Sequence, residues 1–309
     1  TDIDSDLLMY SLPDGSTGTS LTTTKGMVTI TDPTTGDFTY QPLDNAERGR
    51  DTFTYQVTDG EGTNTATETI IVGQTIMPLG DSITQGSAFN GDDFGTNEFR
   101  VGYRKPMFYT LGVSGYTFDF VGSLSSGSKV LSDSQHEGHG GWTASRIAFG
   151  DTGFPVDGVR AWLVSNPADV VLLHIGTNGL DPTGGDIDVE AILDEIDDWE
   201  ISPGGNPVTV ILALIINQAP FNQDVTDFNT IVAAMANDRI NNAGDDIILV
   251  DQEKGAGLIY TIDLTGVNGD MSDSLHPNES GYGKMANVWL DALTKVNPKT
   301  GEIPLDKCP

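Results

Sequence analysis

The sequence predicts a two-part α/β protein, in which a small all-β sandwich precedes a larger three-layer α/β/α domain with a central five-stranded parallel sheet. Three observations lead to this prediction. Residues 1–73 alternate β-branched and aromatic residues with polar ones, and Asp-Gly and Thr-Gly turn signals separate the runs. From residue 74 onward, apolar strands alternate with helical stretches. The length of 309 residues suits a mid-sized domain with a small companion.

The first 73 residues are expected to form the sandwich. Its expected strands are 27–30, 37–40, 52–57 and 65–72. The segments 36–42 (GDFTYQP) and 51–60 (DTFTYQVTDG) resemble cadherin-like or immunoglobulin-like modules of large secreted bacterial proteins. Asp2, Asp4 and Asp6 alternate at the amino end and are candidates for a structural calcium site, because calcium prefers carboxylate oxygens. A solvated acidic terminus is the alternative.

Residues 74–309 carry the pattern of a parallel sheet with helices on both faces. Strands are expected at 75–79, 117–121, 169–175, 208–215 and 247–250, and helices at 104–112, 156–166, 188–199, 224–243 and 279–296. Five strands with intervening helices indicate a flavodoxin-like three-layer sandwich. In such open sheets the reactive groups gather at the carboxyl ends of the strands.

Composition and charge exclude several classes of function. Acidic residues outnumber basic ones 45 to 15, which gives a net charge of -30 and makes nucleic acid an unsuitable partner. No stretch approaches the roughly 20 apolar residues that span a bilayer, so no membrane insertion is expected. Cys308 is the only cysteine, which excludes an intramolecular disulfide. The first residues lack the features of a signal peptide, so we expect a secreted bacterial protein numbered from after a removed leader or from inside a larger parent.

A serine after the first strand of the α/β part is the candidate nucleophile. Ser82 lies in the segment 77–86 (MPLGDSITQG), at the first strand-to-helix turn. A serine needs a base that takes its proton and a third group that orients the base. In the segment 271–278 (MSDSLHPN), the spacing of Asp273 and His276 lets a turn bring the carboxylate to one imidazole nitrogen while the other nitrogen faces Ser82. These three residues are predicted to form a catalytic triad; a helix-capping serine is the alternative.

Two further segments are candidates for an oxyanion hole, which stabilises the negative charge that develops during acyl transfer. The first is 136–142 (HEGHGGW), expected as a glycine-rich loop in which the N–H of Gly141 can approach a ligand closely. The second is 174–179 (HIGTNG), where the side-chain amide of Asn178 follows the third strand. The N–H of Ser82 completes the predicted set. Asp81 and Trp142 are candidates for the substrate pocket, and simple packing is the alternative for Trp142.

The histidines outside the triad are expected to be structural. His136, Glu137 and His139 lack the spacing of a zinc site on one helical face, so we expect them to support the loop that carries Gly141. His174 lies inside an apolar strand and is expected to pack in the core. No cofactor is predicted to be required for catalysis. The chain also lacks the Gly-x-Ser-x-Gly elbow of α/β-hydrolase lipases.

The segments that contain Ser82, Gly141, Asn178 and His276 resemble, in this order, the four conserved blocks of the SGNH (GDSL-like) hydrolases. The finer spelling at 102–104 (GYR), 119–123 (DFVGS) and 136–142 is similar to that of acetyl xylan esterases of carbohydrate esterase family 3. The resemblance implies an SGNH hydrolase domain over residues 74–309. Gly179 departs from the pattern, because many relatives have Asp after the block-three Asn.

What the resemblance implies for function is a serine esterase that hydrolyses short-chain acyl esters, above all acetyl groups on a polysaccharide. An arylesterase, lysophospholipase or thioesterase of the same superfamily is the alternative, since the pocket rather than the fold sets the substrate. The alternative from another class is a non-catalytic polysaccharide-binding or adhesion protein, in which the serine motif is incidental.

Overall fold

The computed structural model describes residues 8–13, 20–43, 49–60, 62–86, 97–113, 118–151, 157–293 and 295–296. The contacts divide the chain into two compact units, with the boundary between Gly73 and Gln74. Asp2, Asp4 and Asp6, the candidate calcium ligands, lie outside the described residues. In the part of the chain that is described, no helix is both long and apolar enough to cross a bilayer.

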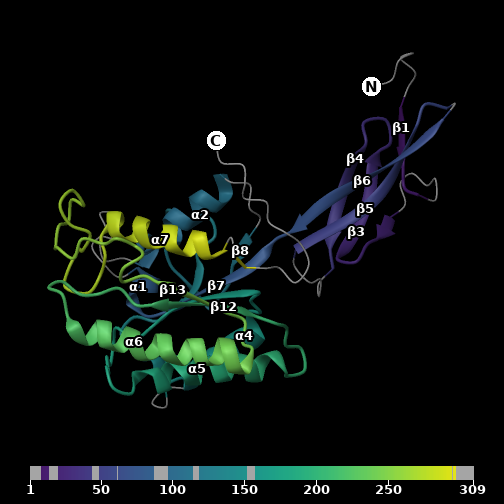
Figure 1. Ribbon diagram of the computed structural model, residues 1–309. Helices are drawn as coiled ribbons and strands as arrows, with labels where there is room; N and C mark the ends of the chain where they lie inside the picture. The colour runs from purple at the N-terminus through teal and green to yellow at the C-terminus, as the bar shows by residue number, and fades with distance from the viewer. Residues whose placement is uncertain are drawn as a thin grey trace. The chain divides into compact units, whose positions relative to one another are not determined.

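The N-terminal unit is built from two antiparallel three-stranded sheets (Figure 1). The strands are β1 (Met9–Ser11), β2 (Ser20–Thr22), β3 (Gly26–Asp32), β4 (Asp37–Pro42), β5 (Gly49–Thr58) and β6 (Thr63–Val72). One sheet has the order β1-β5-β6 and the other β2-β3-β4. Val28 and Ile30 of β3 pack with Phe53 of β5 and with Leu12, so the apolar faces of both sheets share one small core. The four predicted strands of this unit are present.

The second unit has a central sheet in the order β13-β12-β11-β7-β10-β9, with β8 also paired to β7. Its strands are β7 (Gln74–Gly80), β8 (Phe118–Phe120), β9 (Leu124–Ser125), β10 (Gln135–Gly138), β11 (Val170–His174), β12 (Thr209–Leu214) and β13 (Ile247–Asp251). All five predicted strands are present and pair in parallel. The sheet is nevertheless mixed, because β9 runs antiparallel to β10.

Helices cover both faces of this sheet, which confirms the predicted three-layer α/β/α class (Figure 1). The helices are α1 (Ser82–Gln85), α2 (Arg104–Val113), α3 (Ala144–Phe149), α4 (Val159–Ser165), α5 (Gly185–Glu200), α6 (Gln223–Asp238) and α7 (Glu279–Leu293), together with the short 3-10 helix Asn97–Phe99. Residues of α3, α4, α5 and α6 pack on one face, and residues of α2 and α7 on the other.

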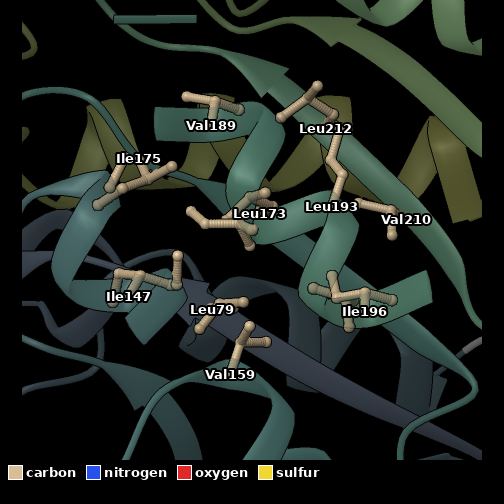
Figure 2. Packing of buried hydrophobic residues seen from close by; sticks show 14 of the residues in the cluster. Leu79, Ile147, Val159, Leu173, Ile175, Val189, Leu193, Ile196, Val210 and Leu212 are labelled. Atoms are coloured by element: carbon tan, nitrogen blue, oxygen red, sulfur yellow. The ribbon is translucent and has the colours of Figure 1, made fainter. Parts of the chain in front are cut away.

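Successive side chains of β11 pack on opposite faces of the sheet. In β11, Val171 and Leu173 face the cluster with α3 to α6, while Val170 and Leu172 face the cluster with α2 and α7. A strand that is buried on both sides has a continuous run of apolar residues, so β11 can be recognised from the sequence. Figure 2 shows the first cluster, in which Leu173 lies among side chains of α3, α4, α5 and the neighbouring strands.

The long helices follow their apolar periodicity. In α5, Val189, Ile192, Leu193, Ile196 and Trp199 recur at helical spacing, and all five are buried. The predicted helix 224–243 is present, but its last turn, Arg239–Ala243, is a π-helix. Its Arg239 forms ion pairs with Asp194 (2.6 Å) and Asp197 (2.5 Å), which tie this turn to α5, and with Asp245 (2.5 Å) just after the turn.

Candidate active site

The turn from β7 into α1 presents Ser82 at the carboxyl end of the central strand. Gly80 ends the strand between its register partners Gly138 of β10 and His174 of β11. A side chain at Gly80 would collide with the backbone carbonyl of His174, so this close approach requires glycine. Asp81 then caps the helix by accepting a hydrogen bond from the N–H of Ile83 at 2.9 Å.

The hydroxyl of Ser82 contacts the imidazole of His276. The distance from Ser82 Oγ to His276 Nε2 is 2.8 Å. On the other side of the ring, His276 Nδ1 lies 2.8 Å from Asp273 Oδ2 and 3.0 Å from Oδ1. Because a carboxylate accepts hydrogen bonds, Nδ1 carries the proton and the lone pair of Nε2 faces the serine. The three residues therefore form a continuous hydrogen-bonded series that could take a proton from Ser82.

A tight turn holds Asp273 and His276 in register. Asp273 Oδ1 accepts hydrogen bonds from the N–H groups of Leu275 (2.8 Å) and His276 (2.7 Å). Burial alone would raise the pKa of Asp273, but these two bonds and the adjacent imidazole hold that pKa below its usual value. The carboxylate therefore remains ionised beside the imidazole. This is the turn that the spacing predicted.

Residues that the sequence analysis did not single out support this turn from the next loop. The N–H of Ala219 donates to the carbonyl of Ser274 at 2.9 Å. The same loop begins at Asn217, whose side chain donates to Glu253 Oε1 at 2.8 Å. Glu253 also accepts from Asn229 at 3.0 Å, so a buried carboxylate fixes the loop that contacts the Asp273–His276 turn. Isolated Asn and Glu residues carry no sequence pattern that indicates such a network.

Arg104 anchors α1, the short helix that begins at Ser82, and the sequence did not predict this role. Its guanidinium is fully buried and donates to the carbonyls of Thr84 (3.3 Å) and Gln85 (3.2 Å) at the end of α1. It also donates to the carbonyl and the hydroxyl of Ser126, at 3.2 and 2.8 Å. Burial lowers the pKa of Arg104 to about 10. The GYR segment was the sequence signal for this residue.

The candidate oxyanion donors follow two strands that flank β7. After β10, residues 139–142 form a turn in which the N–H of Trp142 donates to the carbonyl of His139 at 3.1 Å. Gly141 occupies the third position with φ +79°, as in a type II turn. After β11, the side-chain amide of Asn178 donates to the carbonyl of Trp142 at 3.2 Å. The segments of Gly141 and Asn178 are thus joined beside the end of β7.

The prediction that Asp81 contributes to the substrate pocket needs correction. Its side chain has 0% exposure, so it has no surface that a substrate could touch. Burial raises the pKa of Asp81 to about 6. Oδ1 caps α1, and the hydroxyl of Thr177 is a further hydrogen-bonding neighbour of the carboxylate. Asp81 therefore lies beneath the serine as a helix cap.

The segment 136–142 differs from the expected loop, because Gln135–Gly138 forms strand β10 of the central sheet. His136 accepts from the N–H of Gly138 at 2.9 Å and contacts the hydroxyl of Ser126 at 2.7 Å. Burial and the nearby Arg104 charge hold the pKa of His136 well below its usual value. Among the described residues, no group of three or more His, Cys, Asp or Glu side chains is arranged to hold a metal ion. Glu137 pairs with His139 at 2.8 Å.

Two other residues from the sequence motifs, His174 and Gly179, are explained by burial and by backbone conformation. His174 is buried, which lowers its pKa to about 4, and its Nε2 lies 3.3 Å from the N–H of Ile216. It is therefore a neutral core histidine. Gly179 has φ +68°, and a side chain there would press on the methyl group of Thr143. The aspartate that many relatives carry would be strained in this backbone conformation.

Two family models and one curated relative match this chain. Residues 76–289 match the family model for GDSL-like Lipase/Acylhydrolase, and residues 1–72 match that for Bacterial Ig domain. The chain is 30% identical over 239 residues to the multidomain esterase of Ruminococcus flavefaciens, covering 71% of this chain. It spans only 28% of the length of that relative.

Solved structures show the same fold. The family 3 carbohydrate esterase of Clostridium thermocellum is 28% identical, with a TM-score of 0.55 over 72% of this chain and 98% of that chain. A family 3 carbohydrate esterase of Talaromyces cellulolyticus is 22% identical, with a TM-score of 0.54 over 74% of this chain and 100% of that chain, and it supports the fold alone. The resemblance predicted from the motifs is confirmed: this chain belongs to the GDSL-like lipase/acylhydrolase family and carries a bacterial Ig domain at its N-terminus.

Proposed function

We propose that this protein is a carboxylic ester hydrolase that releases short acyl groups, acetyl above all, from carbohydrates. The observation that carries the proposal is the series Ser82–His276–Asp273, with contacts of 2.8 Å on both sides of the imidazole, in a chain of the GDSL-like family. This arrangement supplies a nucleophile, a base and a group that orients the base.

In the proposed first step, Ser82 Oγ attacks the carbonyl carbon of the ester while His276 Nε2 takes the hydroxyl proton. The imidazolium that forms is stabilised by Asp273. His276 then gives this proton to the alcohol oxygen as the C–O bond breaks, which leaves the acyl group on Ser82. Water attacks the acyl-enzyme in the second step, His276 again takes the proton, and the free acid leaves as Ser82 recovers its hydrogen.

Three donors are proposed for the oxyanion: the N–H of Ser82, the N–H of Gly141 and the side-chain amide of Asn178. Ser82 is the first residue of α1, so its N–H has no partner within the helix. Asn178 uses one amide hydrogen for the carbonyl of Trp142, which leaves the second for the oxyanion. Such donors act most strongly when they are fixed before the charge develops.

The substrate class is inferred from relatives of this chain. The Clostridium thermocellum structure is described as a family 3 carbohydrate esterase, and the Ruminococcus flavefaciens relative as a multidomain esterase. A net charge of -30 disfavours anionic polymers and is compatible with a neutral acetylated polysaccharide. The predicted secretion suits such a substrate, because a polymer of this kind is met outside the cell.

Ester hydrolysis with acyl chains of increasing length tests the proposal. The native protein and Ser82→Ala are compared on p-nitrophenyl acetate, butyrate and octanoate, and on acetylated xylan. We expect activity on acetate and on the polysaccharide that Ser82→Ala abolishes. Strong turnover of octanoate would favour a lysophospholipase or thioesterase instead. Ser82-independent activity, or none on any ester, would contradict the proposed chemistry.

A further inference from the structure

A cluster of three rings lies beside the turn that carries Gly141. The ring of His139 lies 4.5 Å from that of Trp142 and 4.4 Å from that of Trp162, measured between centroids. The planes of His139 and Trp162 differ by only 14°, so these two rings stack. The guanidinium of Arg146 lies 4.8 Å from the centroid of the Trp142 ring. The rings come from the turn itself and from α4, which packs on the sheet.

A buried carboxylate fixes the imidazole in this cluster. Glu137 Oε2 lies 2.8 Å from His139 Nε2, and the two side chains are 0% and 8% exposed. Glu137 is itself held, because both the N–H and the hydroxyl of Ser123 donate to its carboxylate. The hydrogen bond sets the rotation of the imidazole, and the Trp162 ring sets its plane.

Among the described residues, side-chain packing does not restrain the backbone at Gly141. Gly140 and Gly141 form its centre, and glycine has the widest choice of backbone conformations. A Cβ built at Gly141 would meet nothing within 4 Å, so packing at this position does not hold the backbone. The flanking residues His139 and Trp142 are the ones that are packed, and their rings contact each other.

Two of the three proposed oxyanion donors, the Gly141 N–H and the Asn178 amide, depend on these flanking residues. His139 and Trp142 close the turn through a 3.1 Å hydrogen bond, which sets the direction of the Gly141 N–H between them. The carbonyl of Trp142 also accepts from Asn178 at 3.2 Å. A displacement of Trp142 would therefore move the Gly141 amide and release the Asn178 side chain together.

We propose that His139, fixed by Glu137 and by the rings of Trp142 and Trp162, is a positioning residue that aims the Gly141 N–H at the oxyanion. This inference rests on the proposed serine esterase function. It assigns no proton transfer to His139, which acts only through the backbone of the turn. Since a displacement of about 1 Å in a catalytic group can cost on the order of 100-fold in rate, loss of the restraint should lower kcat.

Kinetics of paired variants test the restraint. Glu137→Ala and His139→Ala should each lower kcat on p-nitrophenyl acetate by about 10- to 100-fold with KM within about twofold. Glu137→Gln, which can keep a hydrogen bond to the other imidazole tautomer, should recover most of kcat. Because Glu137 acts through His139, the double alanine variant should be no slower than His139→Ala. The matched control is Arg160→Gln, an exposed residue on the helix of Trp162, with unchanged kinetics expected.

The affinity for a boronic acid distinguishes a misplaced oxyanion donor from a general loss of order in the protein. Phenylboronic acid forms a tetrahedral adduct with a nucleophilic serine, and such an adduct uses the oxyanion donors. Its affinity should fall in Glu137→Ala by about the same factor as kcat/KM. Trp162→Leu should lower kcat in the same way while Trp162→Phe preserves it, which tests the ring contact if Glu137→Ala does not fold.

Each outcome decides between the two proposals. Unchanged kcat in folded Glu137→Ala and His139→Ala, with Ser82→Ala inactive, would overturn the positioning role and leave the esterase function intact. Additive losses in the double variant, or a rise in KM without a fall in kcat, would also overturn it. A native protein without Ser82-dependent activity would overturn both the function and this inference.

Discussion

Ser82 Oγ and His276 Nε2 lie 2.8 Å apart although 194 positions separate the two residues in the chain. The parallel sheet makes this contact possible, because it brings the loops that follow its strands to one edge. Asp273 completes the series on the far side of the imidazole at 2.8 Å. The proposed chemistry depends on this series more than on any other feature.

Asp273→Asn should lower kcat by at least about 100-fold and leave KM nearly unchanged, because an amide can hold the imidazole in the wrong tautomer. Steady-state kinetics on p-nitrophenyl acetate measure the effect. Asp238→Asn, at the exposed C-terminal end of α6, serves as a charge-matched control. Equal kcat for Asp273→Asn and the native enzyme would contradict an orienting role for Asp273.

Asn178→Ala should lower kcat by about 100- to 1000-fold with little change in KM, since an oxyanion donor acts mainly in the transition state. Loss of its bond to the Trp142 carbonyl adds to the effect through the turn of Gly141. Steady-state kinetics on p-nitrophenyl acetate give kcat and KM separately for the variant and for the native enzyme. An Asn178→Ala variant whose only defect is a higher KM would show that this side chain binds substrate instead.

Asp81→Asn should stabilise the protein at alkaline pH. Burial raises the pKa of Asp81 from 3.8 to about 6, so folding favours the neutral acid. This contribution is fully present below pH 4 and is lost as the pH rises through about 6. An asparagine still caps α1 but never ionises, so the variant should gain roughly 3 kcal/mol at pH 8 and about half of that at pH 5.

Urea unfolding of the native protein and Asp81→Asn at pH 5 and pH 8 measures this difference. The comparison isolates Asp81 together with its charge interactions, because every other titrating group is common to both proteins. A gain in the free energy of unfolding that is the same at both pH values would show that ionisation of Asp81 is not its source.

Two isoleucines of α5 provide a matched test of the core. Ile192 is fully buried against the sheet, whereas Ile187 is 66% exposed. Ile192→Ala should lower the free energy of unfolding by about 2–5 kcal/mol, because it leaves a cavity. Ile187→Ala should change it by less than about 0.5 kcal/mol. Equal losses for the two variants, measured in urea, would contradict the packing of this helix.

The sequence predicted the elements whose burial is decided by local pattern. Four of the five predicted parallel strands are apolar runs, and β8 instead places Asp119 between two phenylalanines. Helices α5 and α6 present one apolar face each. The turn from Asp273 to His276 was predictable for the same reason, since its hydrogen bonds lie within four residues. Ser82 was identified by its place after the first of these strands.

Features that depend on tertiary contacts were not predictable in this way. Strand β10 has the sequence QHEG, which lacks any strand pattern, and it is held in the sheet by pairing with β7 and β9. The burial of Asp81 is likewise set by the elements packed around it. Arg104 and Glu253 support the site through contacts with distant segments, and no local spacing connects them to it.

The most direct test of the central claim is to label the nucleophile itself. The native protein, Ser82→Ala and His276→Ala are treated with diisopropyl fluorophosphate, and intact mass and peptide mapping locate the adduct. We expect one phosphoryl adduct on Ser82 in the native protein, none in Ser82→Ala, and labelling slowed by orders of magnitude in His276→Ala. An adduct on another residue, or equal labelling of Ser82 without His276, would contradict the proposed nucleophile and base.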